Sequence, residues 1–121
     1  MLNGQTILVV EAEFLIALDI QRMLEGLGAG QMLFARAADE VQELGPRWST
    51  IGLAIVEIGP NFSETTLVRG LLAENIPVIC SAADSALRQG HPDFPGVPVV
   101  IKPMSDEDLA VAIAAALTSQ S

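Results

Sequence analysis

Five short runs of apolar residues recur along the chain, and they constrain its fold more than any other feature. Each run is bounded by a charged residue, Gly or Pro, as buried strands commonly are. The runs are Thr6–Val10, Gln31–Ala35, Leu53–Val56, Pro77–Cys80 and Val97–Ile101. Because nearly every position in a run is apolar, rather than alternate positions, they indicate strands of a parallel sheet that is covered on both faces.

The segments between these runs have the spacing of amphipathic helices. Apolar residues at helical intervals predict a helix over Glu13–Leu27. Ser105, with Asp108 three residues later, predicts the N-cap of a last helix that runs to about Leu117. Shorter helices are predicted over Asp39–Leu44 and Thr65–Ala73.

The segment Ala82–Gly96 contains too many Gly and Pro residues for a full helix, so the fourth helix is expected to be shortened. Strand and helix otherwise alternate, which predicts an α/β fold with a doubly wound, five-stranded parallel sheet. Because no linker or repeat divides the sequence, residues 1–121 are expected to form a single domain.

Polar residues follow several of the predicted strands. Glu11 and Glu13 follow the first strand, Glu57 the third, Ser81 the fourth and Lys102 the fifth. The carboxyl ends of parallel strands meet at one edge of a sheet, where ligands bind in folds of this class. We therefore expect carboxylates, a hydroxyl and an ammonium group to converge there.

Charge and composition exclude several classes of function. The chain of 121 residues has a formal net charge of -9, which opposes binding to a phosphate backbone, so no nucleic-acid partner is expected. No apolar run is long enough to span a membrane. Cys80 is the only cysteine and is interpreted as a small buried hydrophobic residue. Together these features predict a cytoplasmic protein.

Four segments of the sequence resemble the receiver domain of two-component response regulators. ILVVEAEFLIALDIQRMLEGLGA resembles the first strand and helix of that family, and GLAIVEIG its third strand. IPVICSA resembles the fourth strand, and VPVVIKPMSDEDLAVAIAAAL the fifth strand with the last helix. The resemblance implies a domain that receives a phosphoryl group from a histidine kinase on an aspartate after the third strand, with Mg²⁺ held by neighbouring acids.

The sequence departs from the family pattern at the positions that perform this chemistry. Glu57 stands at the phosphoacceptor position, and Ala12 replaces the acid that would contact the metal. The hydroxyl position falls on Ala82 or, if the strand is one residue shorter, on Ser81. A position that is often aromatic is Val99, whereas Lys102 matches the family's lysine. The resemblance therefore predicts a receiver that is degenerate at its phosphorylation site.

Our leading hypothesis is an atypical, stand-alone receiver domain with no output domain, which acts in phosphorelay signalling through protein contacts and is not an enzyme. Its expected partner is a histidine kinase or another signalling protein, and its oligomeric state is left open. No cofactor is expected, and Mg²⁺ binding at Glu11 and Glu57 should be weak or absent.

Two alternatives remain open. In the first, Glu57 is a functional phosphoacceptor, with Mg²⁺ held by Glu11 and Glu13. In the second, the carboxylates of Glu11 and Glu57 serve a small-molecule hydrolase, although no further catalytic motif accompanies them.

Overall fold

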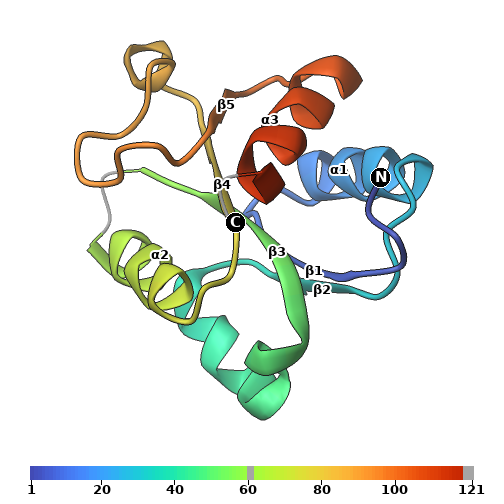
Figure 1. Ribbon diagram of the computed structural model, residues 1–121. Helices are drawn as coiled ribbons and strands as arrows, with labels where there is room; N and C mark the ends of the chain where they lie inside the picture. Colours follow the sequence, from blue (N-terminus) through green and yellow to red (C-terminus); the bar gives the residue numbers. More distant parts are fainter. Residues whose placement is uncertain (60–61, 119–121) are drawn as a thin grey trace.

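A computed structural model describes residues 1–59 and 62–118 and contains a five-stranded, entirely parallel sheet (Figure 1). The strand order is β2-β1-β3-β4-β5, so the order reverses at β1 as expected of a doubly wound sheet. The strands are β1 (Thr6–Val10), β2 (Met32–Ala35), β3 (Ile51–Glu57), β4 (Val78–Ala82) and β5 (Val99–Ile101). The predicted fold class is confirmed.

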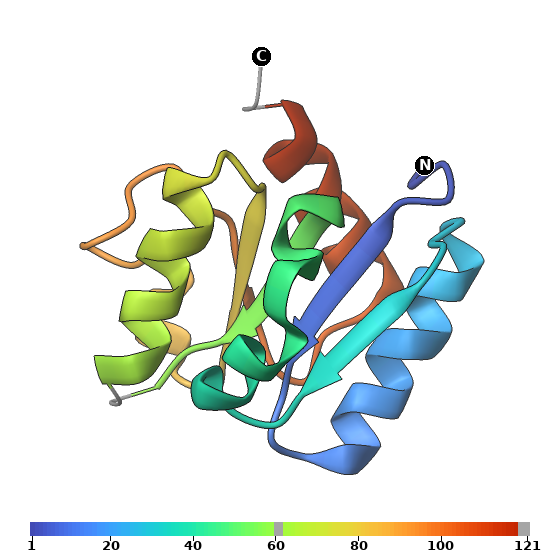
Figure 2. The ribbon, with the colours of Figure 1, turned by 90° about the horizontal axis from the view of Figure 1, so that it is seen from below.

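Helices cover both faces of the sheet. On one face lie α1 (Phe14–Gly26) and α3 (Asp106–Thr118), and on the other lie the 3₁₀ helix η1 (Ala38–Thr50) and α2 (Phe62–Ala73) (Figures 1 and 2). The predicted cap of the last helix is confirmed, because Asp108 N–H donates to Ser105 Oγ at 3.0 Å. None of the helices in the described ranges is long and apolar enough to cross a membrane.

Alternate residues of each strand enter two separate cores. On β1, Ile7 and Val9 pack toward α1 and α3, whereas Leu8 and Val10 pack toward η1 and α2. All four side chains are at most 2% exposed. This double burial explains why the strands lack the apolar-polar alternation of a sheet with one wet face.

The second connection is helical, as predicted, but longer than expected. A short helix was expected over Asp39–Leu44, and the structure has a 3₁₀ helix over Ala38–Thr50. The sequence places a Gly-Pro pair at positions 45 and 46. Proline lacks the N–H that an α-helix interior requires and disfavours α-helical geometry at the residue before it, which explains why this helix is not a regular α-helix.

The fourth helix is shortened, as predicted. It is reduced to the single 3₁₀ turn η2 (Ser85–Leu87), in which Asp84 Oδ1 accepts a hydrogen bond from Ala86 N–H. The rest of the connection to β5 is a long loop, the orange segment of Figure 1. Phe94 anchors this loop in the core, with 3% of its surface exposed, and the Arg69 guanidinium of α2 lies over its ring.

Candidate functional site

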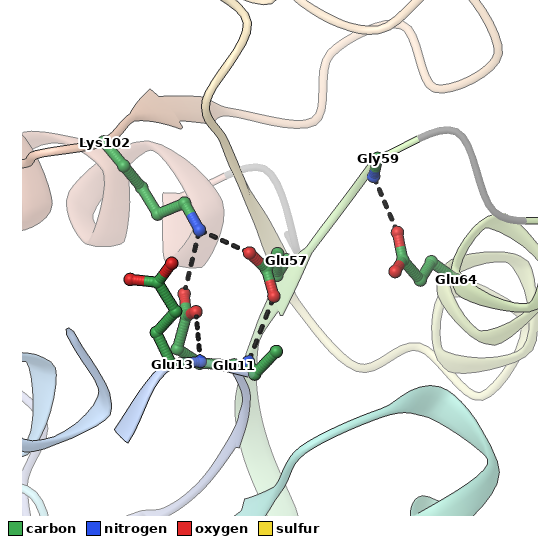
Figure 3. Close-up of polar contacts among 7 residues, drawn as sticks. Glu11, Glu13, Glu57, Gly59, Glu64 and Lys102 are labelled. Carbon is green, nitrogen blue, oxygen red and sulfur yellow. Dashed lines mark hydrogen bonds and ion pairs between the residues drawn. The ribbon is translucent and has the colours of Figure 1, made fainter. Parts of the chain in front are cut away.

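The carboxyl ends of β1, β3 and β5 bring three charged side chains together. Glu11 directly follows β1, Glu57 is the last residue of β3, and Lys102 directly follows β5 (Figure 3). These residues are far apart in the sequence, and the parallel arrangement of the strands places them at one edge of the sheet. We call Glu11, Glu57 and Lys102 the Lys102 cluster.

Lys102 bridges the two carboxylates. Its Nζ lies 3.3 Å from Glu11 Oε1 and also forms an ion pair with Glu57 Oε2. The Lys102 side chain is 10% exposed and that of Glu11 only 1%, whereas that of Glu57 is 25% exposed. The ammonium group therefore compensates the repulsion between two carboxylates that have lost most of their contact with water.

Backbone N–H groups complete the hydrogen bonding of these carboxylates. Glu13 N–H donates to Glu11 Oε2 at 3.0 Å, and Ala12 N–H donates to Glu57 Oε1 at 3.1 Å. With the two contacts from Lys102, every carboxylate oxygen of the Lys102 cluster has a donor. Sequence reasoning missed these backbone donors, although their place directly after Glu11 at a strand end was a signal for them.

Burial and pairing shift the three pKa values in different ways. Burial raises the pKa of Glu11, and the nearby Glu57 carboxylate adds to this effect. Burial alone would also raise the pKa of Glu57, but the hydrogen bonds from Lys102 and Ala12 lower it overall. Burial opposes the charged form of Lys102, yet its bonds to both carboxylates raise the pKa of its ammonium group. The ion pair with Glu57 is thus the one that most favours the charged forms.

The two candidates for the hydroxyl position lie on opposite faces of the sheet. Ser81 is in register with Glu57, is 1% exposed, and has an Oγ without a hydrogen-bond partner among the described residues. Ala82 belongs instead to the core on the η1 and α2 side, and its carbonyl oxygen accepts from Lys102 N–H at 2.8 Å. Of the two side chains, that of Ser81 lies on the same face of the sheet as Glu57, its register partner in the Lys102 cluster.

The remaining predicted positions lie around this cluster. Ala12 and Glu13 are exposed, and the Glu13 side chain lies beside that of Glu11 (Figure 3). Val99 begins β5 and is half-buried against the η1 and α2 core. Among the described residues, no group of three or more His, Cys, Asp or Glu side chains is arranged to hold a metal ion.

Two single residues outside the cluster also bear on the site, one predicted from the sequence and one not. Cys80 is fully buried in β4, and burial raises the pKa of its thiol to about 12, which suppresses the nucleophilic thiolate. Glu64 of α2 was not predicted to have a role, but its Oε2 accepts from Gly59 N–H at 2.6 Å (Figure 3). This bond fastens the chain just after Glu57 to α2.

Comparisons with solved structures give this arrangement a fold family. The signal receiver domain of a modulated diguanylate cyclase from Desulfovibrio desulfuricans G20 is similar with a TM-score of 0.76 and 21% identity, over 95% of this chain and 94% of that chain. The receiver domain of the PhyR response regulator from Erythrobacter litoralis is similar with a TM-score of 0.77 and 23% identity, over 96% and 92% of the two chains. The chain has the receiver-domain fold.

A longer protein contains a similar receiver-fold unit. The response regulator PhyR from Brucella abortus has a TM-score of 0.79 and 28% identity over 97% of this chain, which covers 49% of the PhyR chain. This receiver-fold chain therefore spans about half the length of that regulator. No protein-family model matches the sequence, and no curated protein does.

Proposed function

We propose that this chain is an atypical receiver module of two-component signalling, which acts through protein contacts without efficient phosphorylation of Glu57. The observation that carries the proposal is the Lys102 cluster, in which each carboxylate oxygen already has a donor. An acceptor site presents carboxylate oxygens to an incoming phosphoryl group and to the cation that neutralises its charge. Here the lysine and two backbone N–H groups satisfy them instead.

The donor set does not fit the Mg²⁺ ion that receiver chemistry implies. Mg²⁺ requires several oxygen ligands in near-octahedral geometry. Ala12 supplies no side-chain oxygen where the family pattern has an acid, and both Glu11 oxygens are engaged by Lys102 and by Glu13 N–H. We therefore propose that Mg²⁺ binding at Glu11 and Glu57 is weak or absent, as expected from the sequence.

The length of the Glu57 side chain also opposes phosphoryl transfer. Glutamate is one methylene longer than aspartate, which moves its carboxylate by roughly a bond length. A displacement of about 1 Å between reacting groups lowers the reaction rate about a hundredfold. The longer side chain instead lets Glu57 meet Lys102 and Ala12 N–H together. We propose that these contacts hold one permanent arrangement of the sheet edge.

A phosphorylation assay tests the proposal. The protein is incubated with Mg²⁺ and acetyl phosphate, and its intact mass is measured over time. We expect no added phosphate on the unmodified chain, and measurable labelling of the Ala12→Asp/Glu57→Asp double variant, which serves as the matched positive control. Rapid labelling of the unmodified chain, mapped to Glu57, would instead support the alternative of a functional glutamate acceptor.

We further propose a protein partner, either a histidine kinase or another signalling protein, and a cytoplasmic location. The contact face proposed for this partner is formed by β5 and α3. A groove of about 530 Å³ lies there, beside the loop that replaces the fourth helix, and Glu107 and Asp108 are among its lining residues. With the net charge of -9, these acids favour a basic partner surface and faster association at low salt.

A further inference from the structure

A second groove lies at the same edge of the sheet, but it differs in chemistry from the Lys102 cluster. It has a volume of about 510 Å³ and lies between the first half of α1 and the residues that end β1 and β2. In Figure 2 the arrowheads of β1 and β2 point toward the edge at which α1 begins. We call this hollow the α1–β2 groove.

Two phenylalanines stand at the α1–β2 groove with unusual exposure. Phe14 of α1 is 72% exposed and Phe34 of β2 is 41% exposed, and Leu18, one helical turn after Phe14, is 44% exposed. Large apolar side chains gathered at one hollow indicate a binding site more strongly than exposed residues scattered over a surface do. The rings provide the apolar contact area that such a site needs.

Two alanines, Ala12 and Ala17, are among the residues that line the α1–β2 groove. Their short side chains take up less of its volume than longer ones would. Ala12 is also the residue that replaces the family's acid. The same substitution that removes a metal ligand from the Lys102 cluster therefore leaves an apolar position at the groove.

One charged group at the α1–β2 groove is free to meet a ligand. The guanidinium of Arg36, which follows β2, has no ion pair in the ranges 1–59 and 62–118. Glu11 also lines the groove, but its oxygens are occupied by Lys102 and Glu13 N–H. The net charge of -9 is screened beyond about 8 Å at physiological ionic strength. The Glu40 carboxylate lies close by and accepts from the backbone N–H of Arg36 at 2.9 Å, so the guanidinium is the cation that the groove offers to a ligand.

We propose that the α1–β2 groove binds a small organic anion with an aromatic or aliphatic body and a carboxylate or similar acidic group. The apolar body lies between Phe14 and Phe34, and the acidic group pairs with Arg36. This site shares Glu11 and Ala12 with the edge of the sheet but uses none of the pairing within the Lys102 cluster. It does not depend on whether Glu57 is phosphorylated, so its failure would leave the proposed function standing.

Titration with naphthalene-1-sulfonate, followed by amide NMR shifts, tests this site. We expect shifts at residues 12–18 and 34–36 with a Kd below about 1 mM, which is typical for a ligand of this size. Arg36→Gln should weaken binding about fivefold, whereas Arg88→Gln, an equal loss of charge at the groove beside α3, should not. The neutral analogue 1-naphthylmethanol should bind the unmodified chain more weakly than the sulfonate.

Filling the α1–β2 groove gives an independent test. Ala17→Leu keeps a good helix former in α1 and should weaken sulfonate binding at least about tenfold, while Ala114→Leu on the exposed side of α3 leaves it unchanged. Circular dichroism verifies that both variants fold. Equal affinity in Arg36→Gln and the unmodified chain would overturn the proposal. It would also be overturned if a basic amphipathic peptide shifted these amides while the sulfonate, at about 5 mM, did not.

Discussion

At the carboxyl edge of the sheet, the ends of β1, β3 and β5 hold paired charges, whereas the end of β2 beside α1 presents uncovered apolar side chains. The Lys102 cluster is largely buried, and each of its carboxylate oxygens has a donor. The α1–β2 groove is lined by exposed aromatic rings and an unpaired guanidinium within the described chain. The comparison shows that one sheet edge can pair its charged groups internally at one place and leave apolar side chains uncovered at another.

Removing the lysine should have the largest effect. Lys102→Met leaves the carboxylates of Glu11 and Glu57 without their cation, and we expect a loss of about 3 kcal/mol in the free energy of unfolding at pH 7, measured with urea. The double variant Lys102→Met/Glu11→Gln should recover part of this loss, because it no longer buries an uncompensated charge. Arg22→Met, which breaks the exposed pair with Asp19, is the control and should have little effect.

A single substitution at Ala12 should move the two regions in opposite directions. Ala12→Asp adds an oxygen ligand beside Glu11 and a negative charge at the α1–β2 groove. We expect Mg²⁺ binding, measured by calorimetry, to become at least about tenfold tighter and naphthalene-1-sulfonate binding to become weaker. If the variant left both affinities unchanged, Ala12 would not be the residue that weakens Mg²⁺ binding and favours sulfonate binding.

The pH dependence of stability should reveal the pairing of Glu57. Because its pKa is lowered in the folded protein, its contribution is present above the unfolded pKa of about 4.3 and is lost as the pH falls through the folded value. The contribution of Glu11 has the opposite pH dependence. Because the pKa of Glu11 is raised in the folded protein, stability declines as the pH rises from its unfolded pKa through its folded pKa. Glu57→Gln should therefore reduce the loss of stability in acid, measured by urea unfolding between about pH 3 and 7. Glu25→Gln, at an exposed position of α1, should not change this loss.

The alkaline side reports on Lys102 and on Cys80, whose raised thiol pKa also makes stability decline as the pH rises above the unfolded value of about 8.5. The raised pKa of Lys102 means that its contribution is complete below the unfolded pKa of about 10.4 and disappears as the pH rises through the folded value. In the Lys102→Met variant the part of the alkaline loss that belongs to Lys102 should be absent, and the part that belongs to Cys80 should remain.

Changes in the α1–β2 groove should have the smallest effect on stability. Phe34→Ser removes an exposed ring and should change the free energy of unfolding by less than about 1 kcal/mol. Phe94→Ser, at the buried anchor of the loop before β5, is the contrasting variant and should cost about 3 kcal/mol. A large loss from Phe34→Ser would mean that the ring is structural and does not serve a ligand.

Local sequence signals predicted much of this molecule. The apolar run Thr6–Val10 coincides with β1, and Ser105 with Asp108 marked the start of α3. Because parallel strands share a carboxyl edge, the positions of Glu11, Glu57 and Lys102 along the sequence indicated that these side chains would meet.

Other features depend on three-dimensional relations that the sequence does not contain. The choice between Ser81 and Ala82 required the register of β4 against β3, since a shift of one residue exchanges the two faces of the sheet. The α1–β2 groove depends on which side chains stay uncovered after packing. Phe34 lies in an apolar run that predicts burial, yet β2 is an edge strand and its outer position remains open to solvent.

The Lys102 cluster also has a consequence for the order of folding events. Lys102 is 91 residues from Glu11 and 45 from Glu57 in the chain, and it follows a three-residue strand at the edge of the sheet. Contacts between such distant residues carry a large loop-closure cost, so we expect β5 to join the sheet late and the cluster to be unformed in the transition state. The ion pairs of Lys102 would then slow unfolding of the native protein and leave the rate of folding nearly unchanged.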